Sequence, residues 1–356
     1  MLKNPSLAAN PFFNLAPKGW LLPLVGLSTI ATIIASQAII SGAFSLTYQA
    51  TQLGYLPRLK VVHTSDAERG QVYIPAINRL LLVLTILVVL MFRSSANLAV
   101  AYGIAITLTM LITDLLLFFI MRYHWRWSMS LLLAVAFLAM DGGFFASNSL
   151  KIEKGGWFPL LMGAAVFGIF QIWIQKSDQL KSKLRAGRTD LTQFVKKFNR
   201  DKFHPVPHTA IYLNEDNHHI PSALLHNLEH NQVIHEKIIF LKIAVSTKPR
   251  VLPAERMNYK ELGKGFFRIE MNYGYMEKAT LPVILAFWKS KGIIARMEKA
   301  TCFLSKEHLG TIRTKGLTRL ETSVFGWLQN IDQNDIYYYE IPTNMVFEIG
   351  KQVEIL

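Results

Sequence analysis

The sequence predicts a polytopic α-helical membrane protein with five transmembrane helices, followed by a small α/β domain. Hydrophobic residues make up 51% of the 356 residues, and they are concentrated in long runs within the first half of the chain. Five of these runs are long enough to cross a bilayer. The second half instead alternates short strand-like and helix-like segments, which is typical of an α/β domain.

Residues 1–19 form a polar lead-in that we expect to lie on the extracytoplasmic side. Lys3 and three prolines, Pro5, Pro11 and Pro17, interrupt this segment before any apolar core forms. A secretory signal peptide requires an apolar segment of about 7–15 residues. We therefore do not expect a signal peptide here.

The first predicted transmembrane helix covers residues 20–47, which carry no charged side chain. At about 100° per residue, its small side chains share one narrow face. They are Ala31, Ala35, Ala38 and Gly42. Three hydroxyl side chains share a neighbouring face, namely Thr29, Thr32 and Ser36. Because small residues let another helix come close, this sorting indicates a helix within a bundle rather than a plain anchor.

Four further spans complete a predicted transmembrane region over residues 20–176. They cover residues 74–92, 97–121, 127–145 and 157–174. Asp114 lies well inside the third span of the five, and Asp141 lies near the far end of the fourth. An ionisable residue within a membrane span is a functional candidate by default.

The charges of the connections predict the orientation of the five spans. One set of connections is the richer in basic residues, with Arg58, Lys60, Arg69, Arg122 and Arg126, and Lys176, Lys181, Lys183, Arg185 and Arg188 after the last span. The other set has Lys3, Lys18, Arg93, Lys151 and Lys154. Basic loops stay in the cytoplasm, so the C-terminal half is expected there. The net charge of +14 then reflects membrane orientation, and no nucleic-acid partner is expected.

A basic cytosolic linker over residues 177–205 leads to the predicted cytosolic α/β domain, residues 206–356. Its strand-like runs are Thr209–Leu213, Lys237–Ser246, Phe267–Gly274, Ile294–Leu304 and Asp335–Ile341. Its helix-like runs are Pro221–Asn231, Thr280–Lys291 and Thr318–Asn330. The single cysteine, Cys302, lies in an apolar run, is expected in the core, and excludes an internal disulfide framework.

Several motifs in this order resemble the KUP/HAK/KT family of potassium uptake proteins. In the first half they are NPFF (10–13), ATIIASQAIISG (31–42), QLGYLPR (52–58), HTS (63–65), GQVYIP (70–75), AYGIA (101–105) and GGWFPL (155–160). In the second half they are VPHTA (206–210) and the histidine-containing pairs at 226–227, 230–231 and 235–236. Together they extend over nearly the whole chain.

The resemblance implies a twelve-helix, LeuT/APC-like transporter in the bacterial inner membrane that imports K⁺, usually coupled to H⁺. It implies no cofactor, no enzymatic activity and a homodimer. On this interpretation the five spans are the last five helices of the family. The N-terminal half would then be a missing partner, and it includes a Gly-Tyr-Gly-Asp-type motif that contributes to the ion site.

The candidate ion-binding or pathway residues of the first span are its oxygen-bearing side chains. They are Thr29, Thr32, Ser36, Gln37 and Ser41. A potassium site needs several oxygens that replace the hydration shell of the ion. These side chains have an alternative role, which is to bond between helices or to their own i−4 carbonyls.

Asp114 is the sixth candidate pathway residue. It lies eight positions before Arg122, which is about 12 Å along a helix. Arg79, at the start of the second span, is its expected partner in a structural ion pair, and a proton relay is the alternative. Asp141 would cap a helix end, guide cations or be solvated at the interface.

Residues His226–His230 match an H-x-x-E-H pattern, in which two histidines share one helix face. A membrane-tethered metallohydrolase is therefore one alternative, although the family-like flanks explain the same residues without a metal. We expect neither a catalytic nor a metal site, and exposed positions for His218 and His219. The other alternative is a membrane-anchored regulatory or interaction fragment of a split transporter, without autonomous transport.

Overall fold

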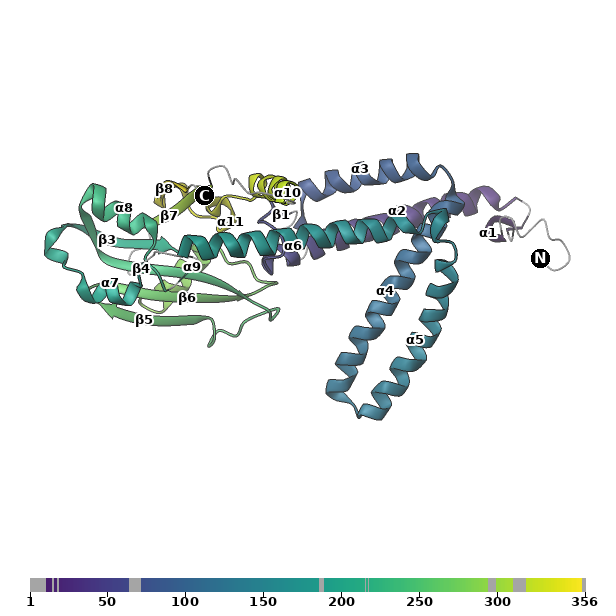
Figure 1. Ribbon diagram of the computed structural model, residues 1–356, viewed down its shortest axis with the longest axis horizontal. Helices are drawn as coiled ribbons and strands as arrows, with labels where there is room; N and C mark the ends of the chain where they lie inside the picture. The colour runs from purple at the N-terminus through teal and green to yellow at the C-terminus, as the bar shows by residue number, and fades with distance from the viewer. Residues whose placement is uncertain are drawn as a thin grey trace.

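The computed structural model describes residues 11–14, 16, 17, 19–63, 72–185, 189–214, 216, 218–293, 299–309 and 318–353. A long helical part and a six-stranded α/β part lie end to end along its longest axis (Figure 1). The helical part comes from the first half of the chain, as the distribution of apolar residues predicts.

The helical part contains one short and five long helices. They are α1 (Pro11–Asn14), α2 (Leu21–Gln52), α3 (Pro75–Phe92), α4 (Ser95–His124), α5 (Trp127–Ser149) and α6 (Trp157–Arg185). Within the described part of the chain, α2 to α6 are long and apolar enough to cross a membrane. Proline at the first turn begins α3, and Arg93 in the left-handed region (φ 50°) ends it. The five predicted spans therefore correspond to helices, although α2 and α6 extend well beyond their predicted cytoplasmic ends.

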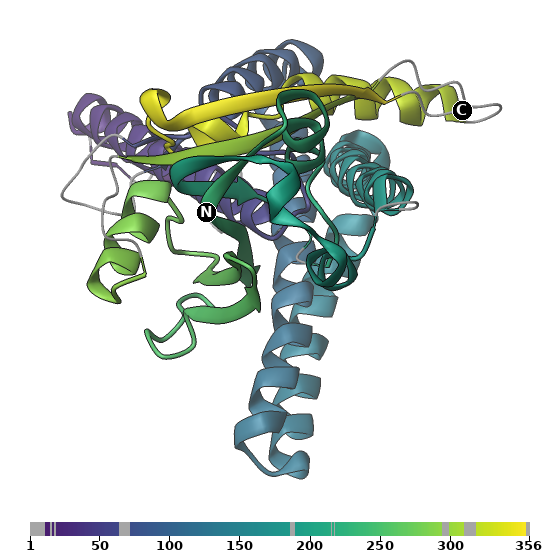
Figure 2. The ribbon, with the colours of Figure 1, turned by 90° about the vertical axis from the view of Figure 1, so that its left-hand side faces the viewer.

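The helices do not all run in the same direction. Helices α2, α3 and α6 follow the long axis of the molecule, whereas α4 and α5 form a hairpin that diverges from them (Figure 1). A view along the long axis shows the same hairpin projecting to one side (Figure 2). The segment just before α6 nevertheless packs tightly against α4, because a Cβ at Gly156 would lie 2.0 Å from Cδ1 of Ile104.

The α/β part is built on one sheet with the strand order β5-β6-β4-β3-β7-β8. Its strands are β3 (His204–Leu213), β4 (Val233–Ser246), β5 (Met257–Gly263), β6 (Phe266–Gly274), β7 (Ala300–Leu309) and β8 (Val346–Val353). All neighbouring strands pair in parallel except β5, which pairs antiparallel with β6 at one edge. Among the described residues of the N-terminal half, two short strands pair with one another, β1 (Val62–His63) with β2 (Val72–Tyr73).

Two apolar cores cover the two faces of this sheet. Helix α9 (Leu281–Ser290) buries Ile284 and Trp288 on one face. Helices α7 (Leu191–Lys197) and α8 (Ser222–His226) bury Leu191 and Leu224 on the other. A largely parallel sheet covered on both faces is the expected solution for apolar strands. Beyond β7 lie α10 (Thr318–Asn330) and α11 (Asp335–Tyr338).

Some predicted boundaries differ from the structure. Residues 177–205 are not a separate linker, because α6 continues to Arg185 and Leu191 of α7 is fully buried in the α/β core. The run Asp335–Ile341 is not a strand, since the side chain of Asn334 accepts a bond from the amide of Ile336 and begins α11. Strands β5 and β8 were not predicted. Part of the run Ile294–Leu304 lies outside the described residues, and the rest belongs to β7.

Candidate functional site

The predicted ion-binding side chains all lie on the exposed surface of α2. The hydroxyl of Thr29 donates to the carbonyl of Val25 (2.8 Å), and that of Thr32 donates to the carbonyl of Ser28 (2.8 Å). Ser36, Gln37 and Ser41 are exposed on the following turns. The structure therefore keeps the hydroxyls on one continuous helix, and no described element covers them.

The i−4 bonds do not use up the coordinating capacity of these hydroxyls. A threonine hydroxyl has one hydrogen to donate and two lone pairs to offer. When the hydrogen of Thr32 is directed back along the helix, its oxygen lone pairs remain available on the helix surface. The uncovered surface of α2 can therefore present oxygens to a cation once another element closes over it. Whether these residues contact an ion remains a prediction.

Asp114 and Asp141 are brought together in the seam of the α4–α5 hairpin. Their residues are 7% and 5% exposed, and each carboxyl lies within the electrostatic and hydrogen-bonding range of the other. Arg79, the expected partner of Asp114, is instead exposed on α3. No salt bridge joins Arg79 to Asp114, although the structure describes both residues. The neighbour that the structure gives to Asp114 is thus another carboxyl group.

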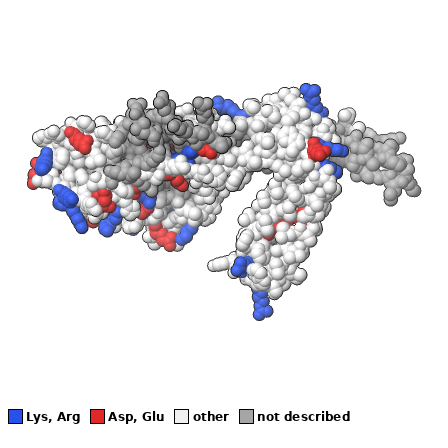
Figure 3. Space-filling view, viewed as in Figure 1, with Lys and Arg blue, Asp and Glu red and all other residues white. Residues whose placement is uncertain are grey.

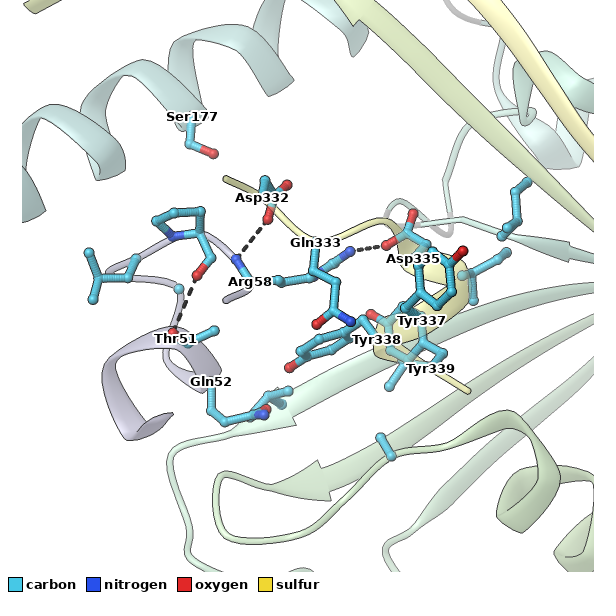
Figure 4. Close-up of a pocket in the computed structure, with 18 of the residues that line it drawn as sticks. Thr51, Gln52, Arg58, Ser177, Asp332, Gln333, Asp335, Tyr337, Tyr338 and Tyr339 are labelled. Carbon is cyan, nitrogen blue, oxygen red and sulfur yellow. Dashed lines mark hydrogen bonds and ion pairs between the residues drawn. The ribbon is translucent and has the colours of Figure 1, made fainter. Parts of the chain in front are cut away.

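A cavity of about 590 Å³ lies between the C-terminal end of α2 and the α/β part. Its lining includes Asn214 and Val245, at the carboxyl ends of the parallel strands β3 and β4, and Ser305 within the neighbouring strand β7. Ligands of open α/β sheets bind at this end of the strands. The labelled residues around the cavity come from α2 and the loop after it, from α6, and from the segment that contains α10 and α11 (Figure 4).

Arg58, in the loop after α2, is the main polar contact between the two parts of the molecule. Its backbone amide donates to Oδ1 of Asp332 (2.7 Å), and its guanidinium forms an ion pair with Asp335 (Figure 4). The same guanidinium lies over the rings of Tyr338 and Tyr339, at 5.0 and 5.3 Å from their centroids. From the sequence, Arg58 is predicted only as a basic residue of the connection after the first span, at the end of the QLGYLPR motif.

Other groups support this contact. The backbone amide of Gln333 donates to the backbone carbonyl of Arg58 (2.6 Å). On α6, Trp173 packs against Phe325 of α10 with ring centroids 5.5 Å apart, and Lys176 pairs with Glu321 (3.1 Å). We call the residues Arg58, Asp332, Gln333, Asp335, Tyr338 and Tyr339 the arginine latch. Burial raises the pKa of the Tyr338 hydroxyl, which the nearby Arg58 guanidinium opposes.

The histidine pattern of the second half lies at the end of α8. The rings of His226 and His230 stack with their centroids 5.5 Å apart. Among the residues that the structure describes, no group of three or more His, Cys, Asp or Glu side chains is placed to hold a metal ion. His219, in the preceding loop, lies with Nδ1 2.7 Å from Oδ2 of Asp216. The structure thus supplies no third ligand for the two stacked histidines among these residues.

The helical part and the α/β part differ in the number of charged side chains on their surfaces. On the face shown in Figure 3, the helical part is almost free of Lys, Arg, Asp and Glu except near the helix ends and at one patch within the hairpin. The α/β part carries charges of both signs over its surface (Figure 3). A long uncharged surface on several helices is what a lipid environment requires.

Comparison with known proteins gives matches along almost the whole chain. Residues 1–178 match the family model described as "K+ potassium transporter integral membrane domain", and residues 207–355 match "K+ potassium transporter C-terminal domain". Relatives include "Probable potassium transport system protein Kup 2" of Chromobacterium violaceum (41% identical) and "Probable potassium transport system protein Kup" of Pseudomonas putida (42% identical). All of this chain aligns with them, but it covers only 58% and 56% of their respective lengths. No solved structure matches the chain.

Proposed function

Because the chain belongs to the K⁺ potassium transporter (KUP/HAK/KT) family, we propose that it forms part of a membrane system that takes up potassium. The proteins of this family are transporters rather than enzymes, and the chain is a multi-pass membrane protein. It spans little more than half the length of the curated relatives that it matches. The activity of the whole protein is therefore assigned to this chain together with the part of the relatives that it does not cover.

The observation that carries the proposal is the uncovered, oxygen-bearing surface of α2 within the matched membrane domain. K⁺ is held by oxygens that replace its hydration shell, and its passage requires no covalent chemistry. Thr32 and Ser36 lie one turn apart near the middle of α2, where a second group of helices would complete the site. Sites in transporters with inverted repeats are built from both repeats, which agrees with a surface that is open in this chain.

Membership of the family further suggests a LeuT/APC-like bundle, coupling of K⁺ to H⁺ and a homodimer, which we include in the proposal. We also propose that the α/β domain lies in the cytoplasm, because of the basic residues in the connections between the helices. The basic connections after α2, α4 and α6 support the orientation. The arginine latch joins the cytoplasmic end of α2 to the α/β domain, so movements of α2 and of that domain would be coupled.

The proposal is tested in cells that lack their own potassium importers. One strain produces this chain alone, and a second produces it with the part of the Chromobacterium violaceum relative that the alignment leaves uncovered. We expect growth at low K⁺ in the second strain. Growth of neither strain, with both polypeptides present in the membrane and the intact relative active as a control, would refute the proposal. Growth of the first strain would show that the chain transports alone.

A further inference from the structure

Two aspartates face one another halfway along the α4–α5 hairpin. Asp114 and Asp141 are the only acidic residues in the sequence of the hairpin. Among the described residues they are also the only buried carboxylates, with 7% and 5% of each residue exposed. Both lie in helices that are long and apolar enough to cross a membrane.

The packing of the hairpin holds the two side chains in its seam. The buried positions of α4 include Thr107, Asp114 and Met121, which are seven residues apart. On α5, Ala134 and Asp141 are buried at the same spacing. A seven-residue repeat keeps one stripe of each helix against its neighbour along their whole length. The position of each aspartate within the repeat therefore directs its carboxyl group towards the other helix.

The contacts of the two carboxyls leave one oxygen of each without a partner. Oδ2 of Asp114 and Oδ1 of Asp141 are buried and accept no hydrogen bond. The basic side chains of the hairpin, Arg122, His124 and Arg126, are all at its tip, and Arg122 lies over the ring of Trp127 (5.0 Å). At about 1.5 Å per residue, Arg122 is about 12 Å along α4 from Asp114.

No other packed element brings a charge to the pair. Helix α6 meets α4 near Ile104, ten residues before Asp114, and its first basic residue is Lys176. The short helix η2 (Ile152–Lys154) carries Glu153 and Lys154, and Lys151 precedes it. These residues follow α5, at the end of the hairpin opposite its tip. Helix α3, which also contacts α4, carries one basic residue, Arg79, which is exposed and forms no salt bridge with Asp114. Within the described elements packed against α4 and α5, each aspartate therefore has only the other as a titratable neighbour.

Two ionised carboxylates in contact inside a membrane would repel one another and would both lose their hydration. One proton held between them removes one charge and supplies a donor for the facing carboxylate. We infer that Asp114 and Asp141 form a carboxyl pair that binds one proton from the aqueous phase. This proton site lies on helices other than the proposed cation-coordinating surface of α2, and it goes beyond the proposed potassium uptake.

The inference is tested by infrared spectroscopy of the complete chain in lipid nanodiscs at pH 7. The carbonyl stretch of a protonated carboxylic acid is separate from the carboxylate bands, so a difference spectrum between two variants isolates the pair. We expect the band in the unaltered chain and its loss in the D114N/D141N double variant. Asparagine has nearly the same shape as aspartic acid, and circular dichroism checks that the helices are retained.

Single variants distinguish a shared proton from two separate groups. In Asp114→Asn or Asp141→Asn, the remaining carboxylate has a neutral amide donor beside it, so it ionises and the band at pH 7 decreases. Glu153→Gln, an exposed residue of η2, is the matched control and should leave the band unchanged. A band that is absent from the unaltered chain, or that persists in the double variant, would overturn the inference. Because the readout is spectroscopic, it is independent of whether potassium uptake is observed.

Discussion

Replacement of Arg58 by alanine should weaken the contact between the helical part and the α/β domain. The side chains of Arg58 and Asp335 are 24% and 36% exposed, so their ion pair is only partly screened and contributes about 0.5–1 kcal/mol. Contacts of the guanidinium with the rings of Tyr338 and Tyr339 add about 0.5–1 kcal/mol more. A total of about 1–2 kcal/mol corresponds to a rise of about 5- to 30-fold in the undocked population.

Hydrogen exchange measures this change at the amide of Gln333, which donates to the carbonyl of Arg58. We expect its exchange in Arg58→Ala to be faster by about 5- to 30-fold, in proportion to the undocked population. Asp335→Ala should show a smaller effect, and the double variant should show less than the sum because the two residues interact. Lys248→Ala is the matched control, since its pair with Glu255 is exposed at the surface. Equal exchange in Arg58→Ala and Lys248→Ala would refute the role assigned to the arginine latch.

Three further predictions concern other parts of the molecule. Burial raises the pKa of the Cys302 thiol to about 12. Maleimide should therefore label the folded chain very slowly at pH 7 and label the unfolded chain rapidly. Fast labelling of the folded chain would contradict the buried position of Cys302. Burial, with the like charge of His208, lowers the pKa of His235, so the unfolded state binds more protons below about pH 6.5. The thermal stability of the α/β domain should therefore be constant above about pH 7.5 and fall as the pH decreases from about 6.5. His235→Gln should make the stability less dependent on pH. The same pH profile in His235→Gln and in the unaltered chain would contradict this role of His235. Gly156→Ala should destabilise the chain by about 1–3 kcal/mol, because the new methyl group would overlap with Ile104. Adding Ile104→Val, which removes the overlapping methyl group, should restore part of the lost melting temperature. Equal melting temperatures of Gly156→Ala and the unaltered chain would contradict the close packing.

The membrane helices could be predicted because length and apolar composition alone define them. Each predicted span corresponds to one of α2 to α6. The ends were less well predicted, because α2 and α6 continue as helices beyond the apolar segment. Nothing in the composition of Tyr48–Gln52 stops a helix, and the chain turns only at Gly54 (φ 79°).

The α/β domain was predicted in outline because several of its strands are apolar and β-branched. The segment after Asn334 was misassigned, since Ile336 and three tyrosines favour a strand while the side chain of Asn334 caps a helix. Strand β5 was not predicted because it lies at the edge of the sheet and carries mostly exposed polar residues. Local patterns thus gave the class of the domain but not its edges.

The contacts between distant segments could not be predicted from one sequence. The pairing of Asp114 with Asp141 depends on the relative rotation of two helices, although the seven-residue spacing of their buried neighbours is visible in the sequence. The arginine latch joins Arg58 to Asp335, 277 positions later in the chain. A charge in a basic loop gives no indication of such a partner. The candidate oxygens of α2 are therefore visible in the sequence, whereas these two contacts are not.

Transport itself can be tested by the uptake of radioactive rubidium, as a substitute for potassium, in cells that produce this chain with the part of the Chromobacterium violaceum relative that the alignment leaves uncovered. We predict saturable uptake that external K⁺ inhibits, and a marked decrease in the double variant Thr32→Val with Ser36→Ala. Thr85→Val on α3, whose hydroxyl also bonds an i−4 carbonyl, should leave uptake unchanged as the matched control. Uptake no higher than in cells without this chain, with both polypeptides present in the membrane, would contradict the account.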